Sequence, residues 1–569
     1  MAEKAQKLVN TINKDKLLND EPVVEISKTK VKKTFTKFTT SNIGDIIPVA
    51  VKEVVPGDTL YGCKTGFIKH MQTPIKPLFN AVYDDFYLCF VPHRQSADLL
   101  NGYKTRKSPF VKVFGEDPTG TDVIVPFENQ MLPKINANHY QIIFDGISIL
   151  DKLGVRGRDK KIVPGYNFLS LAAYELIYQS IFRNENRESV TNSSLYRKLF
   201  NLYNNVTPSL TLEDLQPHKA NREKDYFTGS KPFTQKGEAP RINLSGDVSI
   251  SPHVQGDASV VLETKGLSSA EARFSTTATL QNPHLINNAN GNILPTISDE
   301  SIQNIINELD IYGDMSTVSI TAKQLRLLLK TQEMLEKDAI YGSKYQEQIF
   351  SSFGIKPYPL ELDDPLLLSH DTVTNNFQMV FQTSQTSDEP AILGTVGANS
   401  TTQAVFELFK NGSYEFKEYG YLMVVATTRS QNAYSARHYH DRKDFKTSRF
   451  EFYTPELNDL GYQDILPCEF DKTGGVIGYN EAYAEYRYDW NIVDSELDPL
   501  NPDNLGYWSL AMANYDDIQS MYKQSTIELD RAVSITSAVS PNFVCAYKFE
   551  MILDRPIKLH SIPGFDGVI

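Results

Sequence analysis

The chain has 569 residues, which is enough for several domains or for one large domain with long insertions, and its 41% apolar and 22% charged residues are ordinary values for a globular protein. The net charge of −13 excludes a protein that binds nucleic acid with its whole surface, because phosphate binding needs a positive field. Four scattered cysteines without a Cys-x-x-Cys pair exclude a disulfide framework and a cysteine-based zinc site, and they favour a reducing compartment.

The N-terminal segment, residues 1–40, is basic. It contains nine lysines and five acidic residues, a net charge of +4, so the rest of the chain carries −17. It has little apolar periodicity before Val31 and no apolar signal core, and we interpret it as a mobile or extended arm of a soluble protein that is made in a cytosol, without membrane insertion. Such an arm either neutralises the phosphates of single-stranded nucleic acid or merely serves as a soluble tail, and the residues alone favour neither. The candidate nucleic-acid-facing residues are Lys28, Lys30, Lys32, Lys33 and Lys37.

Three segments rich in β-forming residues come next, at 46–55, 60–70 and 79–91. Turns containing proline or glycine separate them. This pattern predicts consecutive antiparallel strands of an all-β domain, with Gly57 at a position that tolerates a positive φ. The first turn, which we expect to be structural, consists of Pro56, Gly57, Asp58 and Thr59.

The middle of the chain combines loops with a helix. Residues 95–164 are rich in Pro, Gly and Asn, which predicts long loops with short strands near 122–125 and 141–144. Apolar residues at helical spacing predict an amphipathic helix over 167–183. Residues 238–318 are rich in Ser, Thr, Asn and Gly and poor in apolar residues, so we expect a surface excursion there.

A second helix and a further set of strands complete the chain. Thr321 and Gln324 form a capping box, which predicts the start of a helix inserted within residues 321–350. The last third then returns to β-forming residues. The strands that we expect there are 414–427, 450–453, 475–490 and 543–553.

A series of short motifs runs from residue 44 to residue 564. It includes the Pro-Gly-Asp-Thr turn, Phe-Val-Pro-x-Arg at 90–94, Asp-Tyr-Phe-Thr at 225–228, Gln-Lys-Gly at 235–237, Gly-Ser-x-Tyr at 342–345 and Arg-Pro at 555–556. In this order the motifs resemble the major capsid proteins of microviruses, most closely those of the gokushovirus branch. One departure is visible at Ile340-Tyr341, where an Arg/Gly-rich pair is usual.

The resemblance implies a fold and a function. The implied fold is all-β, an eight-stranded antiparallel jelly-roll sandwich in which residues 41–569 form a single capsid domain with long loop and helix insertions. The implied function is that of a major capsid protein, not an enzyme and without a cofactor, which self-assembles into the icosahedral shell of a single-stranded DNA bacteriophage. Gokushovirus capsid proteins carry a surface protrusion, which the segment 238–318 would correspond to.

The resemblance also implies partners and a location. The partners would be other copies of the chain, packaged circular single-stranded DNA, a small basic internal DNA-binding protein and a bacterial surface receptor. The location would be the virion capsid, with assembly in the bacterial host cytoplasm. With the resemblance in hand, packaged DNA becomes the favoured partner of the basic arm.

The alternative function is a jelly-roll phage surface protein that binds or cleaves glycans. Cleavage needs two positioned carboxyl groups in a cleft, and the candidate pairs are Asp84 with Asp85 and Glu361 with Asp363. Adjacent residues of a strand point to opposite faces, so we expect Asp84 and Asp85 not to act together. The aromatic residues within 479–490 would stack on sugars, but strand aromatics more often fill a core or a subunit contact.

We expect no metal site. His438 and His440 would share one face of an extended segment, yet only Asp441 and Asp444 lie nearby, and solvated histidines are favoured. The acidic loop 494–503 lacks the glycine and terminal glutamate of a calcium-binding EF-hand, so turn-forming aspartates are favoured there. Phosphate-binding loops, nucleophile elbows and His-Glu-x-x-His motifs do not occur in the sequence.

Overall fold

The computed structural model describes residues 26–558 apart from several internal segments. In this described part of the chain, no helix is long and apolar enough to cross a membrane. The residues within that span that are not described are 105, 120–124, 133–147, 156–165, 205–209, 241–248, 255–259, 262–274, 277–284, 288–292, 296–308, 315–321, 343, 356, 382–395, 411, 436–447, 458–459, 466–475, 502–504 and 513–520.

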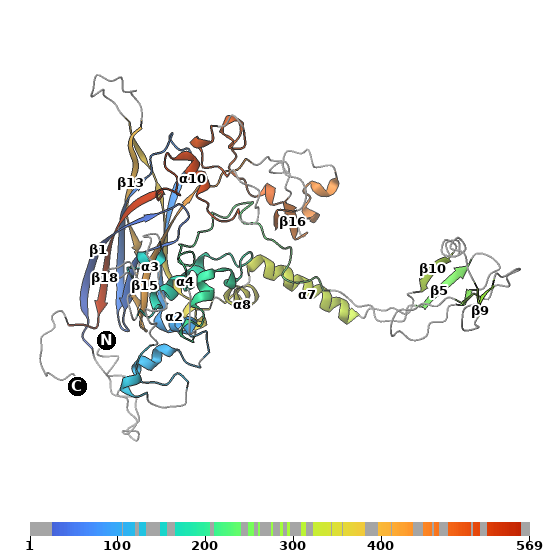
Figure 1. Ribbon diagram of the computed structural model, residues 1–569, viewed down its shortest axis with the longest axis horizontal. Helices are drawn as coiled ribbons and strands as arrows, with labels where there is room; N and C mark the ends of the chain where they lie inside the picture. The colour runs from blue at the N-terminus through green and yellow to red at the C-terminus, as the bar shows by residue number, and fades with distance from the viewer. Residues whose placement is uncertain are drawn as a thin grey trace. The chain divides into compact units, whose positions relative to one another are not determined.

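The body of the protein is a sandwich of two antiparallel sheets (Figure 1). The six-stranded sheet has the order β1-β18-β3-β13-β12, with β14 paired to β3, and the four-stranded sheet has the order β11-β4-β15-β2. The strands of the six-stranded sheet are β1 (Thr29–Ser41), β3 (Thr59–Met71), β12 (Gln378–Phe381), β13 (Val396–Phe409), β14 (Tyr414–Glu415) and β18 (Phe543–Arg555). Those of the four-stranded sheet are β2 (Ile47–Val54), β4 (Val82–Pro92), β11 (Leu366–Asn375) and β15 (Gly420–Ser430). The expected all-β sandwich is confirmed, although the two described sheets contain six and four strands where we expected eight in all.

An apolar core fills the space between the two sheets. Buried and more exposed residues alternate along β18 from Phe543 to Leu553, as they do in a strand with one face in the core. The rings of Phe67, Phe86 and Tyr547 meet in this core with centroids 5.6 to 6.2 Å apart. Burying one large apolar side chain contributes about 1.5–3 kcal/mol, so the sandwich core is a main source of stability.

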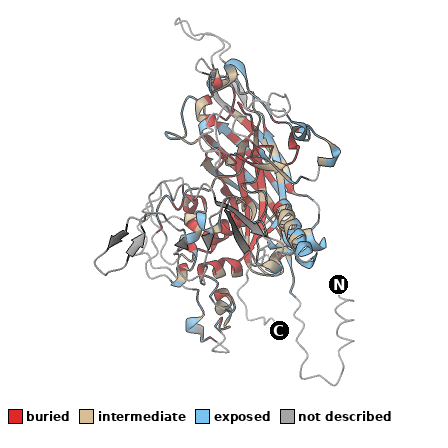
Figure 2. Cartoon of the chain, turned by 90° about the vertical axis from the view of Figure 1, so that its right-hand side faces the viewer, coloured by how far each residue is buried: buried red, intermediate tan, exposed pale blue. Residues whose placement is uncertain are grey.

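Helices cover the other face of the four-stranded sheet. Helices α4 (Leu169–Ile177) and α2 (His93–Leu100) pack against β4, and α3 (Ile149–Lys152) packs against β2. Figure 2 shows buried residues, in red, gathered within the body of the protein. The helix expected over 167–183 is therefore present, and it continues as a π-helical turn over Tyr178–Phe182. All nine residues of α4 are buried, so the expected amphipathic character is wrong. The segments between these helices also contribute buried residues to the cover over this face of the sheet.

Several expected strands differ from the observed elements. Residues 449–451 form a 3-10 turn where we expected a strand over 450–453, and 475–490 contains only the short strand β17 (Gly478–Glu481), paired with β16 (Tyr462–Ile465). Of the aromatic residues that suggested these strands, Trp490 packs in a separate small core with Tyr226, Phe227 and Tyr434, whereas Phe450, Phe452 and Tyr486 are at least half exposed. Of the two short strands that we expected, 141–144 lies outside the described residues, and so does 122–125 apart from Val125, which is not in a strand.

Residues 235–340 form a compact unit of their own. The expected excursion, 238–318, occupies the part of this unit that precedes α7 (Ala322–Tyr341), and α8 (Tyr345–Phe353) follows that helix in the main body. Helix α7 begins one residue after Thr321 of the capping box. The unit also contains three short antiparallel pairs: β5 (Ser249–Val254) with β10 (Leu309–Asp314), β6 (Val260–Val261) with β7 (Ser275–Thr276), and β8 (Leu285–Asn287) with β9 (Ile293–Pro295).

Candidate nucleic-acid interface

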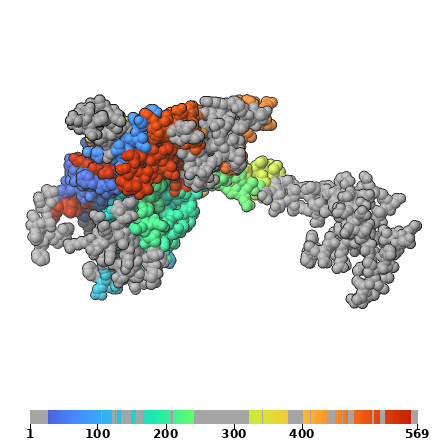
Figure 3. Space-filling view, turned by 45° about the horizontal axis from the view of Figure 1, so that its top comes forward, coloured from blue at the N-terminus to red at the C-terminus, as the bar shows by residue number. Residues whose placement is uncertain are grey.

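The candidate lysines lie on or beside β1, an edge strand of the six-stranded sheet. β1 pairs with β18 along its whole length, and Figure 3 shows the N-terminal and C-terminal colours side by side on the surface. The segment that we expected to be an arm up to residue 40 therefore belongs to the sheet from Thr29 onward, and residues 1–25 lie outside the described residues. The local sequence could not show this, because the partner strand lies about 500 residues away in the chain.

The strand distributes its lysines between two faces. Exposure alternates along β1, since successive side chains of a strand point to opposite sides. Lys30 and Lys32 lie on the exposed face, whereas Lys33 and Lys37 lie on the half-buried face with Phe35, which packs against the sandwich core. The five candidates therefore do not form one surface.

The exposed lysines have partners that leave them in contact with solvent. Lys30 Nζ lies 5.1 Å from the ring centroid of Tyr61, and Lys32 Nζ lies 2.6 Å from Glu550 Oε1. Lys28, just before the strand, lies 2.7 Å from Glu415 Oε1. Exposed ion pairs of this kind contribute little to stability, because water and salt screen them, so phosphate groups compete with them readily.

The half-buried lysines make structural contacts. Lys37 Nζ donates hydrogen bonds to the backbone oxygens of Pro48, at 2.7 Å, and of Lys152. Burial, and then the charge of Lys152, lowers the pKa of Lys37 to about 8. Burial, followed by the charge of Arg555, also lowers the pKa of Lys33. Lys37 is held within the subunit, and Lys33 lies on the same half-buried face, so both are poor candidates for DNA contacts.

The exposed face of the six-stranded sheet carries further basic and apolar groups that sequence reasoning missed. Lys548 of β18 and Lys64 of β3 lie on this face, and Lys64 Nζ is 3.0 Å from Glu407 Oε1. Phe38 and Val405 are 80% and 84% exposed on the same face. Within β3 and within β18, the alternation of a strand predicts which side chains share a face. Only the pairing of β18 with β1 and β3 brings Lys64 and Lys548 to the same face as the exposed residues of β1.

The turn between β2 and β3 contains the four residues that we expected to be structural. Gly57 has a φ of +87°, a conformation that residues with a Cβ adopt rarely. Asp58 is fully buried, and its Oδ2 lies 2.7 Å from Arg555 Nη2 of β18. Gly57 N donates to Phe416 O at 2.7 Å. The turn thus connects the two sheets and ties their ends to the C-terminal strand.

The adjacent carboxyl groups Asp84 and Asp85 point to opposite faces of β4. Asp84 pairs with Lys69 inside the sandwich, while Asp85 Oδ2 accepts a hydrogen bond from Arg429 Nε at 2.5 Å on the other side. Burial alone would raise the pKa of Asp85, but hydrogen bonds from His370, Arg429 and Thr372 lower it below its ordinary value. Both carboxylates are engaged within the fold, and the pair does not form an acid–base couple.

Several of the remaining candidates are also engaged in contacts, and others lie outside the described residues. Asp363 forms an ion pair with Arg94, and Asp498 Oδ1 accepts a hydrogen bond from Ser435 Oγ at 2.6 Å. Trp490 is buried and stacks on Tyr226 at a centroid distance of 4.7 Å. Residues 436–447, with both candidate histidines, are not described. Among the described residues there is no group of three His, Cys, Asp or Glu side chains that could hold a metal ion.

Comparison with known proteins identifies the family. A sequence profile of the family described as "Capsid protein (F protein)" matches residues 21–565. Capsid protein VP1 of Bdellovibrio phage phiMH2K is 26% identical over 567 residues, which cover 96% of this chain and 97% of that protein. The VP1 capsid proteins of Chlamydia phage 1 and Spiroplasma virus 4 are 23% and 25% identical, over 96% and 92% of this chain and 97% and 92% of those proteins. These relatives confirm the resemblance to microvirus capsid proteins, and the chain belongs to the phage capsid protein family as a major capsid protein.

Proposed function

We propose that copies of this chain assemble into a closed icosahedral shell of jelly-roll subunits around a circular single-stranded DNA phage genome. The observation that carries the proposal is the family match over residues 21–565, which spans both sheets of the sandwich. Closed symmetry multiplies modest contacts between identical subunits into a stable particle. The sandwich supplies a rigid wall, because one of its sheets is buried on both faces.

The test of shell assembly is direct. The full chain is expressed alone in bacteria and the purified material is imaged by negative-stain electron microscopy. Uniform closed shells support the proposal. Isolated monomers at all concentrations and ionic strengths would count against self-assembly, and would mean that assembly needs a further component.

The glycan-cleaving alternative receives no support from the carboxylates. Cleavage needs two carboxyl groups flanking one bond, at a separation that leaves room for a sugar. Asp84 is buried with Lys69 in the sandwich, and Asp85 is held by Arg429 on the opposite side of the strand. A non-catalytic shell protein accounts for both residues as structural groups.

The DNA-facing surface in this proposal is the exposed face of the six-stranded sheet rather than the whole basic segment. Lys30 and Lys32 supply charge there, together with Lys64 and Lys548, and Phe38 supplies a ring for base stacking. Single-stranded DNA binds to surfaces that combine cations with aromatic side chains, with little preference for sequence. The shell would turn this face inward, toward the genome and a small basic internal protein.

We place the unit at residues 235–340 on the outer surface of the shell. There it would cluster around a symmetry axis or contact a bacterial surface receptor. Helix α7 supports such a contact role. Leu325 and Leu329, one turn apart on this helix, are 48% and 57% exposed, and adjoining exposed apolar side chains are typical of an interaction surface.

A further inference from the structure

The exposed face of the six-stranded sheet carries carboxylates as well as lysines. Opposite residues of paired strands share a face, so the pairing of β18 with β1 and β3, and of β13 with β3, fixes which charged side chains lie there. Among the described residues of these strands they are Lys30, Lys32, Lys64, Lys548, Glu407, Glu550 and Asp554. Four lysines and three carboxylates leave a net charge of +1. DNA therefore meets a nearly neutral surface, whereas phosphate binding depends on positive charge.

Glu550 of β18 is the carboxylate that lies among three of these lysines. Its Oε1 is 2.6 Å from Lys32 Nζ of β1. Lys64 lies directly opposite it on β3, and Lys548 lies two residues before it on the same face of β18. Opposite side chains of an antiparallel pair have their Cβ atoms about 4.5–5.5 Å apart, within reach of a lysine and a glutamate. Cations from three adjacent strands thus surround one carboxylate.

The three lysines stabilise the ionised form of Glu550. The hydrogen bond from Lys32 is the largest cause that lowers the pKa of this carboxyl group, and the charges of Lys32, Lys64 and Lys548 lower it further, against the opposing effect of burial. A place that favours a carboxylate also favours a phosphate oxygen, because lysine ammonium groups bind both anions as point charges. The three lysines therefore form an anion site, and the chain's own carboxylate occupies it.

The other two carboxylates of this face lie further from the group of lysines. Glu407 Oε1 is 3.0 Å from Lys64 Nζ, but Glu407 belongs to β13, on the far side of β3 from β18 and β1. Asp554 lies opposite Lys30, near the end of the pair of β1 and β18. The side chain of Glu550 is also the less exposed of the two glutamates, at 29% against 47% for Glu407. Glu550 is therefore the carboxylate that restricts these lysines most.

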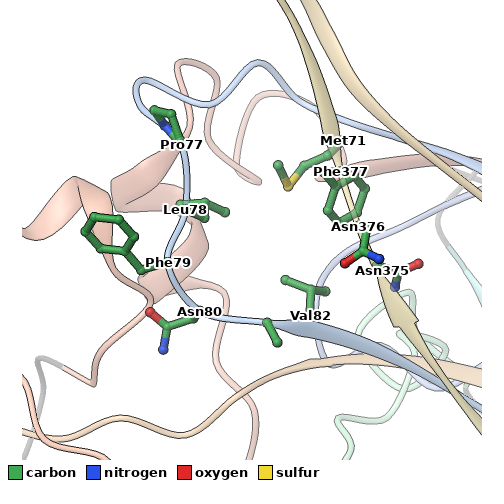
Figure 4. Close-up of a pocket in the computed structure, with 10 residues that line it drawn as sticks. Met71, Pro77, Leu78, Phe79, Asn80, Val82, Asn375, Asn376 and Phe377 are labelled. Atoms are coloured by element: carbon green, nitrogen blue, oxygen red, sulfur yellow. The ribbon is translucent and has the colours of Figure 1, made fainter.

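The cavity at the end of β3 is not an alternative phosphate site. It has a volume of about 480 Å³, and Figure 4 shows apolar side chains around it, among them Met71, Leu78 and Phe377. All ten residues that line it are uncharged, so it offers no cation to a phosphate. The exposed face thus remains the place where this sheet offers cations to DNA.

We propose that Glu550 acts as an internal competitor for DNA phosphates, which must displace its carboxylate to bind Lys32, Lys64 and Lys548. The inference rests on the DNA-facing surface proposed above, since it concerns the regulation of that same surface. One subunit then binds single-stranded DNA weakly, and firm binding requires many copies to contact the same strand, as they do in a shell. Glu550 in this way couples DNA binding to assembly.

The test uses the full chain, below the concentration at which shells form, and a fluorescently labelled oligothymidylate as the probe. Glu550→Gln keeps the size of the side chain and removes its charge. We expect the Kd for the probe to fall about fivefold, because the three lysines become available together. The slope of log Kd against log salt concentration should steepen by about 0.7, the value for one further neutralised phosphate. The melting temperature should change little, since the lost ion pair lies on the exposed face.

Two further variants serve as controls. Glu407→Gln removes the same charge from the same face, one strand further from Lys32 and Lys548, and should lower the Kd by less than about twofold. Glu550→Gln combined with Lys32→Gln should return the Kd close to the wild-type value, since the phosphate then loses one of the lysines that it uses.

The outcomes separate this inference from the proposed function. If neither the wild type nor Glu550→Gln binds the probe at low salt, the exposed face is not a DNA-binding surface, and the proposed surface fails together with the inference. If the wild type binds and Glu550→Gln binds no better, the surface stands and the role of Glu550 as a competitor is overturned. An equal gain in Glu407→Gln would also overturn it, because the effect would then be one of overall charge.

Discussion

Lys69 and Asp84 form an ion pair that joins the two sheets inside the sandwich. Their side chains are 0% and 2% exposed. Thr428 Oγ1 completes the cluster, since it accepts a hydrogen bond from Lys69 Nζ at 2.7 Å and donates one to Asp84 Oδ1 at 2.6 Å. Lys69 comes from the six-stranded sheet and its two partners come from the four-stranded sheet, so the cluster fixes how one sheet lies on the other.

Removing one member of this pair should destabilise the subunit strongly. Lys69→Met leaves the carboxylate of Asp84 buried without a counter-charge, which costs about 3–5 kcal/mol of unfolding free energy. The double variant Lys69→Met with Asp84→Leu removes both charges and should recover most of that loss. Urea unfolding of the unassembled chain measures both. An equal loss in the single and double variants would show that the charges are not the cause.

The stability of the subunit should depend on pH through Lys37. Burial lowers its folded-state pKa to about 8, while the unfolded chain keeps the ordinary value of 10.5. Between these values the unfolded state binds more protons, so the contribution of Lys37 to stability rises as the pH rises from 8 to 10.5. The shift corresponds to up to about 3 kcal/mol. The unfolding free energy of Lys37→Met relative to the wild type should fall by this amount across the window, and a constant difference would contradict the assignment.

Gly57→Val should lower the yield of soluble subunit. The backbone at Gly57 has a φ of +87°, and a β-branched residue there costs about 1–3 kcal/mol of strain. The penalty comes from the backbone, since an added Cβ would meet its nearest neighbour, Pro556, only at 3.8 Å. Gly62→Val provides the control, because Gly62 lies within β3 and its added Cβ would also have room. Equal yields for the two variants would refute the role of the turn.

The two classes of lysine on β1 should behave differently in DNA packaging. Replacing Lys30 and Lys32 with Gln should reduce the DNA content of particles while leaving subunit folding intact, because both side chains are exposed. Replacing Lys33 and Lys37 with Gln should instead lower the melting temperature of the subunit, since Lys37 bonds two backbone oxygens. The DNA content per particle is measured from the ratio of absorbance at two wavelengths. A normal DNA content in the Lys30 and Lys32 variant would show that the exposed face of the six-stranded sheet is not the DNA-binding surface.

Limited proteolysis of intact particles should cut within residues 238–318 first. We place this segment outside the shell, and exposed excursions are the preferred sites of nicking. Mass spectrometry of the fragments locates the cuts. The competing segment, residues 95–164, is also rich in loops, and cutting there with protection of 238–318 would transfer the surface role to it.

Local sequence signals located the elements whose formation depends on nearby residues. A strand expected over 60–70 is observed as Thr59–Met71, because the turn residues on both sides and the spacing of apolar residues define it. The same signals failed for β1, whose lysines and threonines read as a solvated arm until β18 pairs with them. They also failed at 450–453, where aromatic residues suggested a strand and the chain forms a 3-10 turn.

In the candidate site, sequence predicted only those side-chain orientations that follow directly from the alternation of a strand. The opposite orientation of Asp84 and Asp85 follows from the two-residue period of a strand, and the structure shows it. The division of the lysines between two faces was not foreseen, because it requires the knowledge that residues 29–41 form a strand.

The pairing of β1 with β18 has a consequence for synthesis of the protein. β18 lies between β1 and β3 in the sheet, yet the ribosome makes it about 500 residues after β1. β1 therefore has no partner strand until translation has passed Arg555. Contacts between residues this distant along the chain form slowly. A chain released early lacks the strand that joins the two halves of this sheet.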